Sequence, residues 1–383
     1  MKSQVSIVKC ATYQQEALYL KVKEAVDLIG GITAFIRPNS KVLVKPNLLI
    51  PVSPDNNITT HPEFVRAAIR LLKEINCRVY IGDGPSVFGG HSQETSGVYE
   101  ATGMKEVAEQ TGVELVAFDK SFFPERKNPS SAVFPLTTQV KECDFIINLP
   151  KLKTHELMVL TAAVKNLFGL IPGTFKMELH KNFFEPEKFA DMLLDIYQAA
   201  SPALTIIDAI SGIEGNGPAT SGVKRDFGLI LAGKDAVSMD CVLADLIKVD
   251  PEIIFTNKQA RIRNIGNTDL RNIEIKGEEI TGCRIDNFKL PEASLAQLIK
   301  NKLPKPVLNI LKSLLYLRPR IDSDICRLCE SCIKNCPQKT IFKKKGKIVI
   351  DYSNCISCFC CREVCPDAAV KMEKGLLTKI LGM

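Results

Sequence analysis

The stretch KVLVKPNLL, residues 41–49, guides the prediction of the fold. Its first residues are apolar and β-branched, which is typical of a buried strand, and its last residues form a polar loop with proline and asparagine. An apolar run followed by a polar loop returns at residues 78–86, 144–155 and 204–218. Further short apolar runs also read as strands: residues 4–9, 113–118 and 227–233.

Helical patterns separate these strands. Apolar residues recur at three- and four-residue spacing in residues 15–30, 61–75, 99–112 and 186–200. The alternation of strands and helices predicts an α/β fold, in which helices cover both faces of a largely parallel sheet. Residues 251–290 are less regular and contain a possible β-hairpin at residues 272–285.

The chain divides into four predicted parts. Residues 1–290 form the large α/β domain, residues 291–321 a basic amphipathic helical linker, residues 322–370 a small α+β module, and residues 371–383 a helical tail. We expect the linker to strap the two domains together, and contact with an anionic membrane surface is the less favoured alternative. Its apolar stripe comprises Leu295, Leu298, Ile299, Leu303, Leu308, Leu311, Leu314 and Leu315.

The composition limits the classes of function. Of 383 residues, 45% are hydrophobic and 24% are charged, which is ordinary for a globular protein. No apolar run has the length of a membrane span and no signal peptide is evident, so we expect a cytoplasmic protein. Residues 1–290 hold 33 basic and 35 acidic residues, whereas residues 291–383 hold 17 and 8. The large domain is therefore not expected to bind nucleic acid.

Two cysteine runs carry the most specific chemistry. CRLCESCIKNCP, residues 326–337, and CISCFCCREVCP, residues 355–366, both read C-x2-C-x2-C-x3-C-P, the bacterial two-cluster ferredoxin pattern, in which the fourth cysteine binds the other cluster. Structural zinc is the alternative, but zinc sites favour paired C-x2-C knuckles over triplets. The predicted ligands are Cys326, Cys329, Cys332 and Cys365 for one 4Fe–4S cluster, and Cys355, Cys358, Cys361 and Cys336 for the other.

The remaining cysteines need no metal. Cys360 lies between two predicted ligands, and we interpret it as a small buried residue, with a spare ligand or a redox thiol as alternatives. Five others stand among apolar neighbours and are expected in the core: Cys10, Cys77, Cys143, Cys241 and Cys283.

Four polar loops of the large domain are predicted to form one ligand site. They lie at residues 45–49, 82–86, 149–155 and 208–218, each after a predicted strand. In open parallel sheets, ligands bind beyond the carboxyl ends of the strands, although each loop alone reads equally as an ordinary turn. The candidate ligand-binding residues are Lys45, Asn47, Asp83, Lys151, Lys165, Asn166, Asp208 and Glu214.

The loop LPKLKTH, residues 149–155, suggests an anionic ligand. Lys151, Lys153 and His155 alternate along an extended piece, and Thr154 is predicted to cap a helix whose free N–H groups join the lysines in binding the anion. A solvated lysine pair is the alternative, and we expect Lys153 to be exposed. The candidate catalytic residues are His155, His61 and Lys153, because histidine titrates near neutrality and can move a proton.

Nucleotide signatures are missing. Neither GDGPSVFGG, residues 82–90, nor EGNGPATSG, residues 214–222, fits G-x-G-x-x-G, and the chain has no G-x-x-x-x-G-K-S/T loop. Bound nicotinamide and nucleotide hydrolysis are therefore not indicated. Flavin stays open, because flavodoxin-like sites have no single short signature.

The ordered motifs of the large domain resemble the domain-of-unknown-function family 362 (DUF362). The resemblance covers residues 5–250 and rests on VKPNLL, TTHPEFVRAAI, IGDGPS, INLPKLKTH, AAVKNLFGLIPG, IDAISGIEGNGP and LAGKDAVSMD. The family often occurs with a ferredoxin module, and residues 322–370 resemble a bacterial two-cluster ferredoxin. The first resemblance implies a fold and shared loops but no reaction.

Together these observations predict an iron–sulfur protein. We expect low-potential electrons to pass through two 4Fe–4S clusters, to or from a small anionic ligand in the large domain, with a redox protein as partner. One alternative is a non-catalytic electron carrier or maturation factor that docks a protein partner. Another is an isomerase or lyase whose clusters serve only structure.

Overall fold

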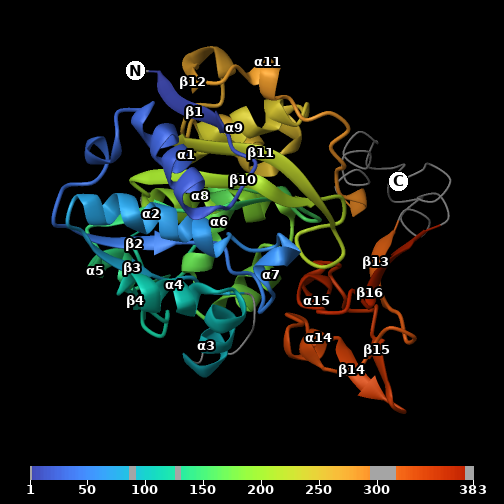
Figure 1. Cartoon of the computed structure of the whole chain (residues 1–383). Coiled ribbons are helices and arrows are strands. Elements are labelled where there is room, and N and C mark those ends of the chain that lie inside the picture. The colour runs from blue at the N-terminus through green and yellow to red at the C-terminus, as the bar shows by residue number, and fades with distance from the viewer. Residues whose placement is uncertain (1, 86–91, 126–130, 294–315, 376–383) are drawn as a thin grey trace.

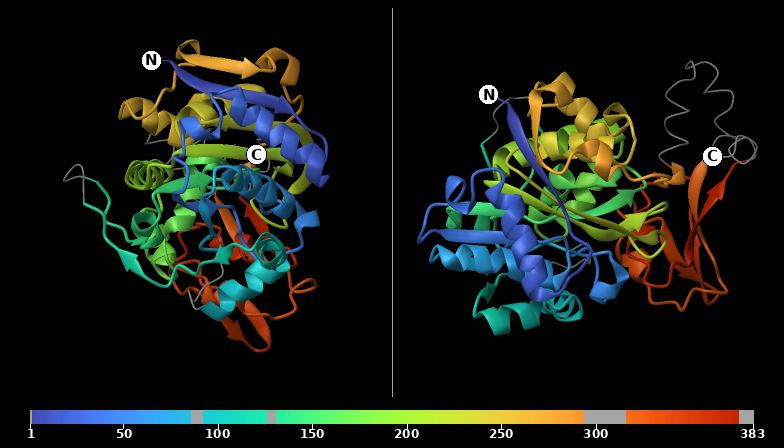
Figure 2. Two further views of the ribbon diagram at one scale, coloured as in Figure 1. Left: turned by 60° about the vertical axis from the view of Figure 1, so that its left-hand side comes forward. Right: turned by 45° about the horizontal axis from the view of Figure 1, so that its top comes forward.

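A computed structural model describes residues 2–85, 92–125, 131–293 and 316–375. Figure 1 shows a large α/β domain and a small module of orange and red elements beside it. The right-hand view of Figure 2 shows this module attached at one end of the large domain. The small module is in direct contact with the large domain.

A ten-stranded mixed sheet forms the centre of the large domain. Strand β11 runs antiparallel to both of its neighbours, and every other neighbouring pair on the main path is parallel. The order along the path is β12 (Ile273–Gly277), β1 (Ser3–Lys9), β11 (Val223–Gly233), β10 (Leu204–Glu214), β7 (Phe145–Asn148), β2 (Lys41–Lys45), β3 (Arg78–Ile81) and β4 (Glu114–Leu115). This arrangement confirms the predicted, largely parallel sheet.

Helices cover both faces of the sheet, and β2 shows how its sequence achieves this. Val42 and Val44 point into a core with α1 (Gln15–Asp27), α2 (Pro62–Glu74) and α4 (Met104–Thr111). Leu43 points into the opposite core with α8 (Pro186–Ala200) and α9 (Ala236–Leu246). Successive strand residues face opposite sides, so a continuous apolar run is what a doubly covered strand requires.

Shorter elements complete the large domain. Helices α3 (Ser92–Ala101) and α10 (Phe255–Ile262) and the pair β5 (Ser121–Phe122) and β6 (Leu136–Thr137) lie outside the sheet, together with α5 (Gln139–Glu142), α6 (Ala163–Asn166) and α7 (Phe175–Asn182). The five cysteines that were expected in the core are all buried. Among the described residues, no helix is long and apolar enough to cross a membrane.

Two local predictions in the large domain are wrong. Residues 272–285 do not form a hairpin: β12 pairs in parallel with β1, and the following residues make the single turn α11 (Ile280–Cys283). The pairing of β12 with β1 gives hydrogen-bond partners to the backbone groups along an edge of β1 that would otherwise be open. Thr154 does not cap a helix, because residues 151–161 fold as strand β8 (Lys151–His155) and strand β9 (Val159–Thr161), an antiparallel pair beside β10.

The small module is built from two strand pairs and two short helices. Strand β13 (Leu317–Ile321) pairs with β16 (Val370–Lys374), and β14 (Ile341–Lys344) pairs with β15 (Lys347–Ile350). Helices α14 (Ser331–Lys334) and α15 (Cys360–Glu363) lie within the two cysteine runs. Residues 371–374 therefore belong to a strand that closes the module, not to the predicted helical tail.

The helical linker predicted for residues 291–321 is wrong at its end, because Leu317–Ile321 form strand β13, and it stays untested over residues 294–315. The apolar stripe of residues 295–315 lies outside the described residues, as does the rest of the tail, residues 376–383.

Candidate functional site

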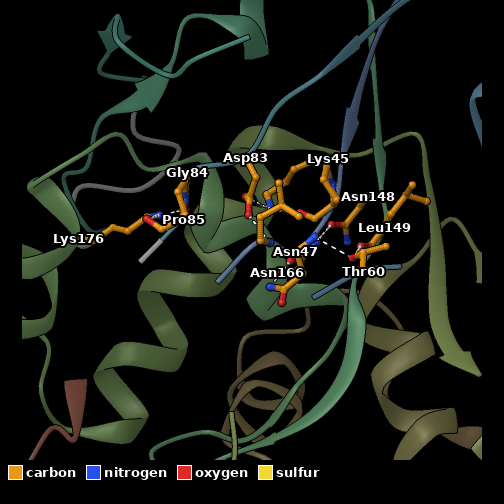
Figure 3. A network of polar contacts seen from close by, with 12 residues as sticks. Lys45, Asn47, Thr60, Asp83, Gly84, Pro85, Asn148, Leu149, Asn166 and Lys176 are labelled. Atoms are coloured by element: carbon orange, nitrogen blue, oxygen red, sulfur yellow. Dashed lines mark hydrogen bonds and ion pairs between the residues drawn. The ribbon is translucent and has the colours of Figure 1, made fainter. Parts of the chain in front are cut away.

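The loops after β2 and β3 meet at the carboxyl edge of the sheet. Lys45 is fully buried, and its Nζ lies 2.7 Å from Oδ1 of Asp83. Oδ2 of Asp83 accepts a hydrogen bond of 2.8 Å from the backbone N–H of Leu48, so the carboxylate holds both loops (Figure 3). Gly169 packs against this pair so closely that a Cβ atom would lie 2.1 Å from Asp83 Oδ1.

A chain of amide side chains connects this pair to the third loop. Lys153 donates to Oδ1 of Asn47 and, at 2.8 Å, to the carbonyl of Ile58. The amide of Asn47 donates to Asn166 at 2.9 Å, and Asn166 donates to Asn148 at 2.8 Å. The structure thus brings together Lys45, Asn47, Asp83 and Asn166 (Figure 3), and Lys153 joins them through its hydrogen bond to Asn47.

The fourth loop contributes Asp208, which forms a separate buried pair. Nζ of Lys151 lies 2.9 Å from Oδ2 of Asp208 and 2.8 Å from the hydroxyl of Tyr13. His61 belongs to this group: its backbone N–H donates to Asp208, and its ring stacks on Tyr13 with 3.8 Å between the centroids. Burial lowers the pKa of His61 to about 4, so the ring is neutral near pH 7.

Glu214 takes no part in this group. Its carboxylate accepts from Arg225 at 2.7 Å and from the backbone N–H of Lys289 at 3.2 Å, which ties the end of β10 to a neighbouring segment. It is therefore a structural contact in this fold, and the structure does not place it with the other candidates.

The expectation that Lys153 is exposed is wrong. Lys45, Lys151 and Lys153 are all buried, because the β8–β9 pair and the neighbouring loops close over them. Burial lowers the pKa of Lys153 well below its ordinary value, and the positive charge of Lys165 adds to this effect. Within the part of the chain that the structure describes, Lys153 has amide and carbonyl partners but no carboxylate.

The predicted anion site at a helix N-terminus is also wrong. The N–H groups of Ala163 and Val164, which begin α6, donate to Asp240 at 2.7 and 3.1 Å. Burial raises the pKa of Asp240 to about 7. Asp240 therefore anchors α6, and this helix then presents Lys165 and Asn166 to the crevice.

The basic side chains at the carboxyl edge of the sheet, among them Lys45 and Lys153, form a group that continues toward the small module. Its further members are Lys165, Lys176 and His180. Burial lowers the pKa of Lys165, an effect that the carboxylate of Glu363 opposes, and no ion pair or hydrogen bond of its ammonium group is seen among the described residues. Lys176 donates to the carbonyl groups of Gly84 and Pro85 (Figure 3), and burial lowers its pKa to about 7. His180 is buried, and its Nδ1 has no hydrogen-bond partner in the described chain.

Helix α15 of the small module covers this basic group. Oε1 of Glu363 lies 3.1 Å from Nε2 of His155, and Arg362 forms an ion pair with Glu156. The N–H groups of Leu157 and Met158 point at Nδ1 of His155, so its proton resides on Nε2, toward Glu363. Burial lowers the pKa of His155 to about 4 and tends to raise that of Glu363, but His155 and Lys165 hold the latter down at about 2.

Further contacts fix the module on the loop after β10. The hydroxyl of Thr220 donates to the carbonyl of Cys365 at 2.8 Å, and Nε of Arg362 donates to Ser221 at 3.2 Å. All these contacts come from α15 or the residues that follow it. The second cysteine run is therefore the docked part of the module.

The cysteines surround two cavities. One small cavity is lined by Cys326, Cys329, Cys332 and Cys365, and another is lined by Cys336, Cys355, Cys358 and Cys361. Each set of four is the one that the ferredoxin rule predicts, with the fourth cysteine exchanged between runs. Four thiols that line one cavity are the ligand set that a 4Fe–4S cluster requires.

The backbone repeats between the two runs. Leu328 and Glu330 have positive φ angles of 59° and 63°, and the corresponding residues Ser357 and Phe359 have φ angles of 51° and 60°. Backbone N–H groups donate to the last thiol of each run, from Thr340 to Cys336 and from Ala369 to Cys365. Both runs thus build the same cradle.

The family follows from comparison with known proteins. Residues 42–245 match the family described as "Domain of unknown function (DUF362)", and this match spans more than half of the chain. The chain belongs to the DUF362 family. Residues 318–366 match a second family, described as a 4Fe–4S dicluster domain, so this DUF362 protein carries an iron–sulfur ferredoxin module.

Similar proteins support each part separately. The thylakoid-associated protein sll1697 of Synechocystis is 31% identical over 76% of this chain and 89% of its own length. Pyruvate synthase subunit PorD of Methanothermobacter marburgensis is 42% identical over 15% of this chain and 67% of its own. An uncharacterized ferredoxin of Methanocaldococcus jannaschii is 36% identical over 14% of this chain and 90% of its own.

One solved structure shows a distant likeness to this chain. The lactate racemase apoprotein from Thermoanaerobacterium thermosaccharolyticum has a TM-score of 0.35 and 14% identity, over 54% of this chain and 50% of that chain. No functional argument follows from it.

The sequence reasoning missed several residues at the site. Tyr13 gave no signal, and Lys176 lies in an ordinary helical pattern. Arg362 and Glu363 had a signal: they are adjacent opposite charges inside a cysteine run, where the cradle itself requires no charge.

Proposed function

We propose that this DUF362 protein passes electrons through two 4Fe–4S clusters to or from a small anionic ligand, held where the large domain meets α15. One observation carries the proposal: buried Lys153 and half-buried Lys165 form no ion pair within the described chain, and the carboxylate of Glu363 acts on both only from beyond ion-pair distance. Buried ammonium groups are costly unless a negative charge accompanies them. A bound anion would supply that charge.

The side chains have distinct roles in this proposal. Lys153 and Lys165 bind the charge of the ligand, and Asn47 and Asn166 orient Lys153. His155 holds a proton on Nε2 at the module side of the site and is the candidate proton donor. His61 lies in the separate group around Asp208, so a role in proton transfer requires a path through Tyr13 and Lys151.

The clusters supply one-electron chemistry when bound. Cys326, Cys329, Cys332 and Cys365 would hold one cluster, and Cys336, Cys355, Cys358 and Cys361 the other. Because four thiols line each of the two cavities, the arrangement supports two clusters per chain and not one. The buried position of α15 would place the second cluster near Lys165 and Glu363, which is the shorter route for electrons into the large domain.

The experiment begins with protein purified without oxygen. About eight irons and eight labile sulfides per chain are expected, and the reduced protein should show the EPR spectrum of two interacting clusters. Stoichiometric zinc without labile sulfide would contradict the cluster assignment. Mass spectrometry of the extracted ligand should find a small anion. The amount of this anion should be reduced several-fold in Lys165→Met. It should be retained in Lys105→Met, a matched change at an exposed position of α4.

A non-catalytic carrier is the second candidate. It predicts a full complement of iron, no co-purified anion, and a stable complex with a protein partner. An exposed basic groove between α7 and the small module is the observation that favours a protein partner, and it is compatible with either candidate.

A further inference from the structure

A groove of 570 Å³ separates α7 of the large domain from the small module. Met177 and Lys181 line it on one side, and Ile333, Lys334 and Lys339 line it on the other. Figure 1 shows α7 facing the module at this place. The groove shares Cys336, Pro337 and Ile341 with the cavity of the second proposed cluster, so a proposed cluster ligand forms part of its wall.

Most of the charged residues that line the groove are basic. Lys181, Lys334 and Lys339 are exposed at its walls, and Glu178 is the acidic residue among the residues that line it. No ion pair of these three lysines is seen in the described part of the chain. Their charges are therefore directed to solvent.

The β14–β15 hairpin continues the basic character from the groove. Ile341, the first residue of β14, lines the groove, and Lys344 and Lys347 lie directly opposite each other farther along the hairpin. Like charges in directly opposite positions destabilise a strand pair. Phe342 shares the outer face of the hairpin with Lys344 and Lys347, opposite to the face of Ile341, and it is 44% exposed, although an aromatic ring gains by burial.

We propose that this groove and the outer face of the hairpin dock an acidic electron-transfer protein, which delivers electrons to the second cluster through the wall formed by Cys336. The proposal rests on the proposed function. Carboxylates of such a partner would neutralise the five exposed lysines, and Phe342 would be its apolar anchor. The concave shape beside a cluster ligand favours a protein over a membrane, which offers no matching convex surface.

The transfer is a simple exchange of one electron. The reduced cofactor of the partner loses one electron, the second cluster gains it, and no proton or covalent bond changes place. Approach to Cys336 shortens the path between the two cofactors.

The test compares two reductants on the cluster-loaded protein. The triple variant Lys334→Glu/Lys344→Glu/Lys347→Glu is mixed in a stopped-flow instrument with reduced flavodoxin, an acidic donor, or with dithionite, a small one. Lys2→Glu/Lys41→Glu/Lys234→Glu is the control, because it makes the same charge change with exposed lysines at the amino-end edge of the sheet. Reduction by flavodoxin should slow at least tenfold in the first variant at low ionic strength and little in the control.

The outcomes separate the two proposals. Clusters that dithionite does not reduce would overturn the proposed function itself. Normal reduction by dithionite with equal flavodoxin rates in both variants would overturn the docking site alone. Salt-sensitive flotation of the unmodified protein with anionic phosphatidylserine vesicles, lost in the first variant, would also overturn it, because the surface would then bind membrane. A Phe342→Ala variant, which keeps every charge, should slow flavodoxin reduction about threefold to tenfold.

Discussion

The two cysteine runs share one backbone design but have different neighbours. Residues 326–337 and 355–366 repeat with an offset of 29 positions, in their cysteines and in their positive φ angles. Helix α14 reads Ser-Cys-Ile-Lys and presents Lys334 to solvent, whereas α15 reads Cys-Cys-Arg-Glu and is buried throughout. The cysteines thus determine the cradle, and the residues between them determine which half docks.

The two halves also differ in the charges that they meet on the large domain. The outward half forms no ion pair with the large domain among the described residues, and Lys334 of α14 is exposed. The docked half has to match Glu156 and His155 in charge and position. Residues at equivalent positions of the two runs are therefore matched pairs for mutation.

Removal of a cluster ligand should have the largest effect. Cys332→Ser and Cys361→Ser, at equivalent positions, should each lower the iron content from about eight to about four per chain. Cys361→Ser should also loosen the docked helix, because Cys361 lies in α15 and is buried. Iron analysis and hydrogen exchange of α15 check both statements, and loss of all iron from either variant would contradict two independent cradles.

Reversal of charge in the docked helix should have the next largest effect. Glu363→Lys places a cation beside Lys165 and should weaken docking by about 3–5 kcal/mol. The equivalent change on the outward helix, Lys334→Glu, should alter stability by less than about 0.5 kcal/mol. Protease sensitivity and small-angle scattering report detachment of the module.

Glu363→Gln is the milder companion variant. It removes the charge without adding a cation, and it should weaken docking by about 1–3 kcal/mol. Equal behaviour of the variants at residues 334 and 363 would mean that α15 is not held by charge.

Acid should loosen the docked half before the outward half. Free histidine titrates near pH 6.5, whereas burial lowers the pKa of His155 to about 4 and that of His180 to about 3. The unfolded state therefore binds more protons between pH 6.5 and 4, and stability falls as pH falls through that range. The loss should be about 1–3 kcal/mol at pH 5.5.

Hydrogen exchange, corrected for intrinsic rates, measures this effect. Protection of α15 should decrease from pH 7 to 5.5, and the decrease should be about halved in His180→Phe. An identical decrease in α14 would contradict the assignment to the docked interface.

Replacement of Cys360 should have the smallest effect. Ser331 occupies the equivalent position in the outward run, so Cys360→Ser makes the two runs more alike. Iron content should be unchanged, and stability should change by less than about 1 kcal/mol. Loss of iron would show that Cys360 is a ligand after all.

Local sequence patterns predicted most of the large domain. Helix α8 has the predicted bounds, residues 186–200, because Pro186 suits a first helical position and the apolar spacing is regular. The polar loops after β2, β3 and β7 do meet, because parallel strands end at one edge. Both results depend on rules that act within a few residues or one sheet.

The burial of the lysines could not be predicted in this way. The partner of Lys153 is Asn47, which is 106 positions away, and the partner of Lys151 is Asp208. The sequence of residues 151–161 fits a helix-capping pattern, but these residues form strands because β8 pairs with the free edge of β10. The docking of α15 was also invisible, because it depends on Glu156 and Arg362 meeting across 206 positions.

The position of α15 over His155 has a consequence for the timing of the proposed reaction. Under the proposed function, a ligand that approaches Lys165 from the module side would have to displace Glu363 first, so ligand exchange and electron delivery would alternate in time. At saturating donor, the turnover rate then equals the rate of release of α15 and no longer depends on donor concentration. A weakened contact, as in Glu363→Gln, would turn over faster at saturation and lose more electrons to oxygen.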